Sequence, residues 1–216
     1  MQKIKTAESV FNDCADDYVR QFMDVSLYGS SFDEFCTSVK QNATVLEIGC
    51  GPGNISKYLL EKRPDLDLFG IDVAPKMIEL AKSYNPTADF AVMDAKEIGT
   101  LKRKFDAVMC GFCLPYLSKE ATIGLIIDTS LLLNENGVLY LSTMEDDYTQ
   151  SRLQTSSNGE YTLFMYFHEA GYLTEALVEN GFEIISQQRQ DYPTKNGSKV
   201  VDLILIARKT AHSQHK

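Results

Sequence analysis

The chain has 216 residues, 44% of them hydrophobic and 24% charged, which is ordinary for a soluble globular protein. Its formal net charge of −9, from 30 acidic and 21 basic residues, argues against a surface that neutralises phosphates, so no nucleic-acid partner is expected. The apolar runs fall short of the ~20 residues that span a membrane, and the N-terminus lacks the apolar core of a signal peptide, which predicts a cytoplasmic protein without a membrane partner.

Strand-like and helix-like segments alternate through residues 1–143. Short apolar runs, typical of strands buried on both faces, occupy residues 43–49, 67–73, 88–94, 105–111 and 137–143. Apolar residues recur with helical spacing in three segments: residues 55–63, a segment that begins at Pro75, and residues 121–133. The turn-like "NENG" after the third segment is expected to end its helix. Strands joined by helical crossovers run parallel, so this alternation predicts a parallel sheet with helices on both faces.

Two more strands follow a helix predicted over 170–181. They are 182–190 and 198–208, and the connection between them, with its turn-prone "KNGS", is too short for a helical crossover. The sequence therefore predicts an α/β fold whose doubly wound, mostly parallel seven-stranded sheet has its last strand antiparallel. The tail, residues 209–216, is expected to fray.

Three glycines within five residues, Gly49, Gly51 and Gly53, separate the first strand from the first helix. Glycine adopts unusual φ angles and has no Cβ to hold a ligand away, and ligands of such sheets bind beyond the carboxyl ends of the strands. A dinucleotide loop, G-x-G-x-x-G, would have its third glycine at position 54, where this chain has Asn54. Glu47, just before the loop, is unfavourable beside a pyrophosphate and favourable beside a cation. The loop therefore points away from NAD.

The five cysteines are odd in number and irregularly spaced, so no disulfide framework is predicted. Cys110 and Cys113 have C-x-x-C spacing, but no second Cys or His pair lies near them in the sequence, and we interpret them as small apolar residues at a strand end. His212 and His215 form a terminal H-x-x-H that we interpret as a solvated end. No metal site is predicted.

The segment "VLEIGCGPGNIS", residues 45–56, resembles the first motif of the class I, Rossmann-like S-adenosylmethionine-dependent methyltransferases, approximately E/D-x-G-x-G-x-G. Four later segments resemble the family's following motifs in order: "FGIDVAPKMIELAK", "FAVMDAKEI", "FDAVMCGFCLPYLS" and "LLLNENGVLYLST". "FNDCADDYVRQF" resembles an N-terminal helix of the small-molecule branch. The resemblance covers about residues 8–208 and implies an N-terminal helical lid over 1–40, a cofactor-binding methyltransferase domain over 41–208, and a frayed tail over 209–216.

The resemblance implies S-adenosylmethionine as the cofactor. Asp72 would accept hydrogen bonds from the ribose hydroxyls, Asp94 would bind the adenine amine, and Glu47 would stabilise the cationic end through water or the loop. The implied cofactor-binding residues are Glu47, Gly49, Cys50, Gly51, Gly53, Asn54, Asp72, Val73, Met77, Asp94, Ala95 and Cys110. Val73 and Met77 also have the spacing of core residues, and Asp94 could instead cap the next helix.

Methyl transfer from a sulfonium is an in-line displacement, in which positioning matters most and a base is needed only for a protonated acceptor. The resemblance places the acceptor above the fourth and fifth strands, which implies Phe112, Met144 and Tyr166 as substrate contacts and His168, Tyr116 and Tyr18 as catalytic residues. The aromatic segment 159–172 is expected to form an acceptor wall or lid, or alternatively core or dimer contacts. His168 is either a base or a structural residue at a helix N-terminus.

The main functional prediction is a methyltransferase that acts on a small molecule, as a monomer or homodimer. An RNA or protein methyltransferase is disfavoured by the charge and by "CGFCLPYL", which stands where an Asn/Asp-Pro-Pro-Tyr/Phe motif would be. A catalytically silent cofactor-binding domain stays open as an alternative, and a nicotinamide-dependent oxidoreductase is disfavoured by Asn54 and Glu47. The acceptor, and whether O, N, C or S is methylated, stay open.

Overall fold

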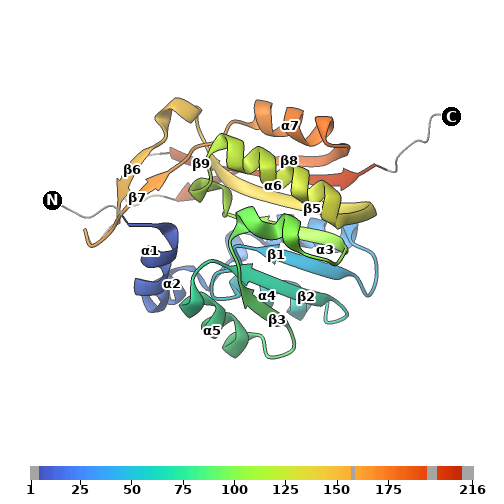
Figure 1. Cartoon of the computed structure of the whole chain (residues 1–216), viewed down its shortest axis with the longest axis horizontal. Helices are drawn as coiled ribbons and strands as arrows, with labels where there is room; N and C mark the ends of the chain where they lie inside the picture. The colour runs from blue at the N-terminus through green and yellow to red at the C-terminus, as the bar shows by residue number, and fades with distance from the viewer. Residues whose placement is uncertain (1–4, 157–158, 194–198, 211–216) are drawn as a thin grey trace.

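The computed structural model describes residues 5–156, 159–193 and 199–210, and its centre is a seven-stranded sheet (Figure 1). The strands are β1 (Thr44–Ile48), β2 (Asp67–Asp72), β3 (Asp89–Val92), β4 (Phe105–Gly111), β5 (Leu133–Glu145), β8 (Phe182–Pro193) and β9 (Lys199–Lys209). Their order across the sheet is β3-β2-β1-β4-β5-β9-β8. Strands β1 to β5 are parallel, whereas β9 runs antiparallel to both β5 and β8. The predicted fold class, with its antiparallel last strand, is confirmed.

Helices cover both faces of the sheet, because successive strand residues point to opposite sides and both sides are apolar. One core packs against α3 (Gly29–Ser38), α4 (Asn54–Lys62) and α5 (Pro75–Tyr84). The other packs against α6 (Lys119–Leu132), α7 (Ala170–Glu179) and the 3₁₀ helix η2 (Ala95–Thr100). Val45 and Leu46, adjacent in β1, are both fully buried and belong to opposite cores.

The N-terminal helices α1 (Ala7–Asp13) and α2 (Ala15–Phe22) lie at the edge of the sheet where the ligand is expected (Figure 1). The amide of Lys76, in the first turn of α5, donates to the Asn12 side chain at 2.9 Å. The amide of Lys5 donates to the Thr162 carbonyl at 3.2 Å, in strand β7. Helix α1 is therefore held from both sides, by α5 and by a strand more than 150 residues away.

The structure corrects two boundaries. Strand β5 begins at Leu133, directly after α6, so the segment "NENG" belongs to a strand and not to a turn. Leu133 pairs with Phe105 of β4, the pairing shifts register after Phe105, and Asn136 adopts a left-handed φ of 61°. Lys209 belongs to β9 and not to a frayed tail, because its ammonium donates to the carbonyls of Ser130 and Leu133. The rest of the predicted tail from residue 211 on, with His212 and His215, and the "KNGS" turn lie outside the described residues.

A hairpin that the sequence did not predict precedes α7. Strands β6 (Arg152–Thr155) and β7 (Thr162–Met165) pair antiparallel, and they form a two-stranded sheet separate from the large one. This hairpin contains part of the aromatic segment 159–172. In the part of the chain that the structure describes, none of the helices is long and apolar enough to span a bilayer.

Candidate functional site

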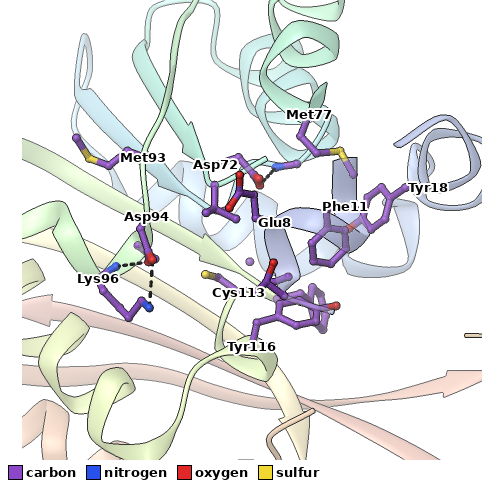
Figure 2. A pocket seen from close by; sticks show the side chains of 18 residues that line it. Glu8, Phe11, Tyr18, Asp72, Met77, Met93, Asp94, Lys96, Cys113 and Tyr116 are labelled. Atoms are coloured by element: carbon purple, nitrogen blue, oxygen red, sulfur yellow. Dashed lines mark hydrogen bonds and ion pairs between the residues drawn. The ribbon is translucent and has the colours of Figure 1, made fainter. Parts of the chain in front are cut away.

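A cavity of about 340 Å³ opens at the carboxyl ends of β1, β2 and β4, under helix α1 (Figure 2). Ligands of doubly wound sheets bind at this edge, next to the point where the strand order reverses, which here lies between β1 and β4. The structure brings together in its lining these residues singled out from the sequence: Tyr18, Gly49, Gly51, Asp72, Val73, Met77, Asp94, Ala95, Phe112 and Tyr116. The others lie in the surrounding protein.

The glycine loop after β1 has the geometry that only glycine adopts readily. Gly49, Gly51 and Gly53 have φ angles of 68°, 52° and 79°. A Cβ on Gly53 would collide with the Asn85 amide and lie 3.1 Å from the Ala81 backbone, so this glycine also lets α4 and α5 approach. Gly49 and Gly51 line the cavity. A Cβ on Gly49 would lie 3.0 Å from the Cys113 Cβ, whereas a Cβ on Gly51 would meet only the Tyr18 ring at 3.8 Å.

Asn54 and Cys50 flank this loop without facing the cavity. The side chain of Asn54 donates to the Phe22 carbonyl at 2.8 Å, so it ties the start of α4 to the end of α2. Cys50 is buried in the core that packs against α4. Cys110, also predicted as a cofactor contact, is fully buried in the opposite core. None of the three belongs to the cavity lining.

Asp72 ends β2 and lines the cavity with both carboxylate oxygens already oriented. Oδ2 accepts from the Gly51 amide at 2.9 Å, and Oδ1 accepts from the Ala74 amide at 2.8 Å. Burial raises the pKa of this carboxyl, which the backbone donors partly offset. Each oxygen keeps a further lone pair, so the carboxylate can accept from two neighbouring hydroxyls while it fixes the loop.

Asp94 follows β3 and has the capping role considered from the sequence, while its binding of adenine stays a prediction. It caps η2 by accepting from the Lys96 amide at 2.9 Å, and it forms an ion pair with the Lys96 ammonium at 3.1 Å. It also lines the cavity, beside Ala95. Figure 2 shows Asp94 and Lys96 at one end of the pocket, opposite the aromatic side chains of Phe11, Tyr18 and Tyr116.

Glu47 is 1% exposed and lies behind the glycine loop, outside the cavity lining. Its carboxylate accepts a hydrogen bond from the Ser56 hydroxyl of α4. Burial raises its pKa to about 8, the Ser56 hydrogen bond lowers it, and the nearby Asp72 charge raises it again. A buried carboxyl with such a raised pKa responds to any charge placed near it.

Aromatic rings close the cavity from the side of α1 and α2. Phe11 makes edge-to-face contacts with Tyr116 and Tyr18, with centroids 5.0 and 5.8 Å apart, and Tyr18 also packs on Phe22 at 4.7 Å. Burial raises the pKa of both tyrosines well above the usual value, so the hydroxyls stay protonated and can act as hydrogen-bond donors rather than bases at neutral pH.

Three residues predicted on the acceptor side lie outside the cavity lining. Tyr166 stacks on Tyr148 with centroids 6.2 Å apart, and its amide donates to the Pro115 carbonyl at 2.8 Å. Met144 lies near the end of β5, and its carbonyl accepts from the His168 amide at 3.3 Å. His168 itself is completely buried.

Both ring nitrogens of His168 are engaged by the protein. Nε2 lies 2.8 Å from the Leu114 carbonyl, which can only accept, so Nε2 carries the proton and Nδ1 accepts from the Tyr172 hydroxyl. Burial lowers the pKa of this imidazole. His168 therefore ties α7 to η3 (Leu114–Tyr116), and no ring nitrogen is left to accept a proton from the cavity.

Replacing His168 by glutamine is expected to lower the free energy of unfolding by about 1–2 kcal/mol, because the hydrogen bond to Leu114 or Tyr172 is lost in a buried place. Ligand affinity at the cavity should change less than twofold. Tyr172→Phe, which removes one partner only, is the matched variant. Chemical denaturation measures the free energy of unfolding, and ligand titration measures the affinity. A large loss of methyl-transfer turnover at unchanged stability would instead indicate that His168 acts as a base.

Several cavity residues were not found by sequence reasoning. They are Thr6, Ala7, Glu8, Phe11, Met93, Lys96, Gly111 and Cys113. Four of these residues belong to α1 or its N-cap: Thr6, Ala7, Glu8 and Phe11. Their local sequence does not indicate against which part of the protein this helix packs. Cys113 did have a signal, its C-x-x-C spacing, but that was interpreted as apolar packing.

Comparison with known proteins gives the family of the central segment. Residues 45–137 match a family model described as a methyltransferase domain. A malonyl-[acyl-carrier protein] O-methyltransferase of Acetivibrio thermocellus is 33% identical over 107 residues, which are 48% of this chain and 36% of the relative. A trans-aconitate 2-methyltransferase of Methylobacterium radiotolerans is 33% identical over 78 residues, 36% of this chain and 30% of the relative. The chain spans about a third of the length of these curated relatives.

Solved structures share the whole architecture. A SAM-dependent methyltransferase of Methanosarcina mazei has a TM-score of 0.69 at 21% identity, covering 82% of this chain and 97% of that one. Magnesium protoporphyrin IX methyltransferase of Synechocystis PCC 6803, with bound SAH, has a TM-score of 0.69 at 18% identity, covering 94% and 97%. At these identities the likeness establishes the fold.

Proposed function

We propose that this chain, which carries a class I, Rossmann-like S-adenosylmethionine-dependent methyltransferase domain, transfers a methyl group from that cofactor to a small-molecule acceptor. The domain rests on the family match over residues 45–137 and on the seven-stranded sheet. The names of the two relatives, for malonyl-[acyl-carrier protein] and trans-aconitate, support a metabolite-type acceptor. The net charge of −9 supports the same choice.

The observation that carries the proposal is the shared cavity of the glycine loop, Asp72 and Asp94. A carboxylate at the end of β2, held by two backbone amides, suits vicinal ribose hydroxyls. The loop leaves room for a ligand against the backbone at Gly51, where an added Cβ would meet only the Tyr18 ring at 3.8 Å. These residues fit a nucleoside with a cationic amino-acid arm, because the nearby acidic groups exceed the basic ones and Glu47 lies behind the loop.

The bound cofactor supplies an electrophilic methyl group on a sulfonium. Asp72 and Asp94 hold and orient the nucleoside, and Glu47 stabilises positive charge at the loop through a low-dielectric interior. Phe11, Tyr18 and Tyr116 exclude water from the reacting end and present ring faces to a cation. The protein's contribution is thus positioning and desolvation.

The cavity favours an acceptor that arrives as a nucleophile. Among the described lining residues, the two tyrosines stay protonated, Asp94 is paired with Lys96, and Asp72 accepts from the amides of Gly51 and Ala74. Glu8 is the one acidic group of this lining that takes no part in these contacts. His168 is held by the protein and does not line the cavity. A carboxylate, or an amine whose pKa lies below about 7, has a free lone pair at neutral pH and fits this site better than an unactivated hydroxyl.

Isothermal titration calorimetry tests the proposal with S-adenosylmethionine, S-adenosylhomocysteine and NADH. We expect the first two to bind at one site, with dissociation constants in the micromolar range typical of such cofactors, roughly −8 kcal/mol, and NADH not to bind. NADH binding without binding of the two sulfur nucleosides would overturn the assignment. Cofactor binding with methylation of RNA or protein in place of small amines and carboxylates would move the chain to the alternative acceptor class.

A further inference from the structure

An aromatic side chain of the cavity wall, Phe112 at the end of β4, is held by contacts from two other parts of the chain. Its backbone adopts a left-handed φ of 56°, which is unfavourable for a residue with a bulky side chain. The Phe112 amide donates to the Ser142 carbonyl of β5 at 3.2 Å and to the Ser142 hydroxyl at 3.1 Å. The Phe112 ring packs against the Tyr28 ring, with centroids 4.9 Å apart. The surrounding protein therefore maintains a conformation that phenylalanine alone would avoid.

Tyr28 is in turn fixed by a buried carboxylate. It ends the 3₁₀ helix η1 (Ser26–Tyr28), and its hydroxyl donates to Asp202 Oδ2 of β9 at 2.6 Å. Asp202 is 2% exposed and pairs with Met144 near the carboxyl end of β5. A hydrogen bond to a carboxylate is stronger than one between neutral groups, and its loss is costly where the carboxylate is buried. The contacts thus form a chain from Asp202 through Tyr28 to Phe112.

The order of the strands places Phe112 beside the reacting end of the proposed cofactor. Four neighbouring strands follow one another as β3-β2-β1-β4, and at their carboxyl ends lie, in the same order, Asp94, Asp72, the glycine loop and Phe112. Neighbouring strands are ~4.8 Å apart, so this row extends over ~14 Å, the scale of a nucleoside with an amino-acid arm. With the ribose at Asp72 and the arm at the loop, the sulfonium substituent points toward the β4 end of the cavity, where Phe112 lies.

We propose that Phe112 is the wall that limits the size of the alkyl group on the sulfonium, and that Tyr28 and Asp202 are positioning residues that hold this wall in place. These roles rest on the proposed function and add to it the residues that restrict the reaction to methyl transfer. A ring that is held at its backbone and on its face does not withdraw easily to admit one more carbon. One methylene group that a tight pocket does not accommodate lowers affinity by roughly tenfold or more.

A second tyrosine–aspartate pair in the chain provides a matched control. The Tyr58 hydroxyl of α4 donates to Asp33 at 2.7 Å, and Tyr58 is not among the residues that line the cavity. Replacing Tyr28 or Tyr58 by phenylalanine removes one hydroxyl and its hydrogen bond to a carboxylate, while the ring stays. Of these two substitutions, Tyr28→Phe alone frees a ring that packs against Phe112.

Isothermal titration calorimetry with S-adenosylmethionine and S-adenosylethionine, in which ethyl replaces methyl, tests the inference on the whole chain. The unmodified sequence should bind the ethyl compound at least about tenfold more weakly. Phe112→Gly, which removes the wall and suits the left-handed backbone, should bring the two affinities within about twofold. Tyr28→Phe should lower the affinity ratio by about threefold or more, and Asp202→Asn, which keeps an oxygen to accept from Tyr28, should preserve most of it. Tyr58→Phe should leave the ratio unchanged.

S-adenosylhomocysteine, which lacks the transferred alkyl group, reports on the rest of the cavity. Its affinity should change by less than about twofold in Tyr28→Phe, and thermal melting checks that each variant folds. Equal affinities for the methyl and ethyl compounds in the unmodified sequence would overturn the wall. An equal loss of all three affinities in Tyr28→Phe, or the same change of ratio in Tyr58→Phe, would overturn the positioning role. If the chain binds none of the three compounds, the proposed function fails and the inference fails with it, whereas binding without discrimination overturns the inference alone.

Discussion

Replacing Asp72 by alanine is expected to weaken binding of S-adenosylmethionine by about a hundredfold, or about 3 kcal/mol, the scale of one to two lost charge-assisted hydrogen bonds. The loss has two sources. The carboxylate can no longer accept from the ribose hydroxyls, and the amides of Gly51 and Ala74 lose the acceptor that holds the loop in place.

The matched control for this substitution is Asp67→Ala, at the opposite end of the same strand. The side chain of Asp67 is exposed, lies 3.3 Å from Arg103, and is at the end of β2 away from the cavity. Its replacement should leave affinity unchanged within twofold. Calorimetric titration gives the affinities and thermal melting shows whether both variants fold. Equal affinity of Asp72→Ala and the unmodified sequence would mean that the nucleoside does not bind at β2.

The fold could be predicted because its signals are local. Each of the five parallel strands is a short apolar run, and Pro75 and the glycine loop mark where helices begin, so the order of elements follows from the sequence alone. The start of β5 could not be predicted, because "NENG" has the composition of a turn. Pairing of Leu133 with Phe105, a contact across the sheet, extends the strand through it.

The same distinction divides the candidate site. Asp72 and Asp94 follow strands whose carboxyl ends share one edge of the sheet, so their meeting in one cavity follows from topology. Glu8 and Phe11 reach that cavity only because α1 docks between α5 and β7, and those contacts leave no pattern in the sequence near them. His168 shows the opposite error, because its chemistry suits a base but both of its ring nitrogens are hydrogen-bonded within the protein.

The cysteine pair shows a third kind of difficulty. Its spacing was visible, but spacing could not tell which thiol would face a ligand. The left-handed φ of Phe112 decides this, because it turns Cys113 toward the loop while Cys110 stays in the core. A backbone conformation that is rare for phenylalanine would not be predicted from propensity.

Replacing Glu47 by glutamine is expected to make the protein more stable above pH 8, and to have little effect on stability near pH 5. The pKa of Glu47 is raised from its ordinary 4.5 to about 8, mainly by burial, so between these values the folded chain holds a proton that the unfolded chain has released. The free energy of unfolding therefore falls as pH rises through this window, by up to about 1.4 kcal/mol per unit. Glutamine stays neutral throughout, and the gap should reach about 2–4 kcal/mol by pH 9.

The stability of both forms is read from denaturant unfolding between pH 5 and 9, with Glu61→Gln as the control on the exposed side of α4. Glu61 is 67% exposed and its contact with Lys57 is 3.9 Å long, so that variant should follow the unmodified sequence at every pH. A Glu47→Gln curve parallel to the unmodified one would show that the carboxyl does not titrate in this window.

Glu47 also links ligand binding to pH. A cation held against the glycine loop favours the ionised carboxylate, so its binding should release a proton from Glu47 between about pH 6 and 8. Calorimetric titrations with S-adenosylmethionine in buffers of different ionisation enthalpy measure that release directly. Glu47→Gln should abolish it and weaken binding. The Glu47→Gln variant would then be more stable and would bind S-adenosylmethionine more weakly. This combination is expected if the buried carboxylate destabilises the fold but stabilises a cation bound on the other side of the loop.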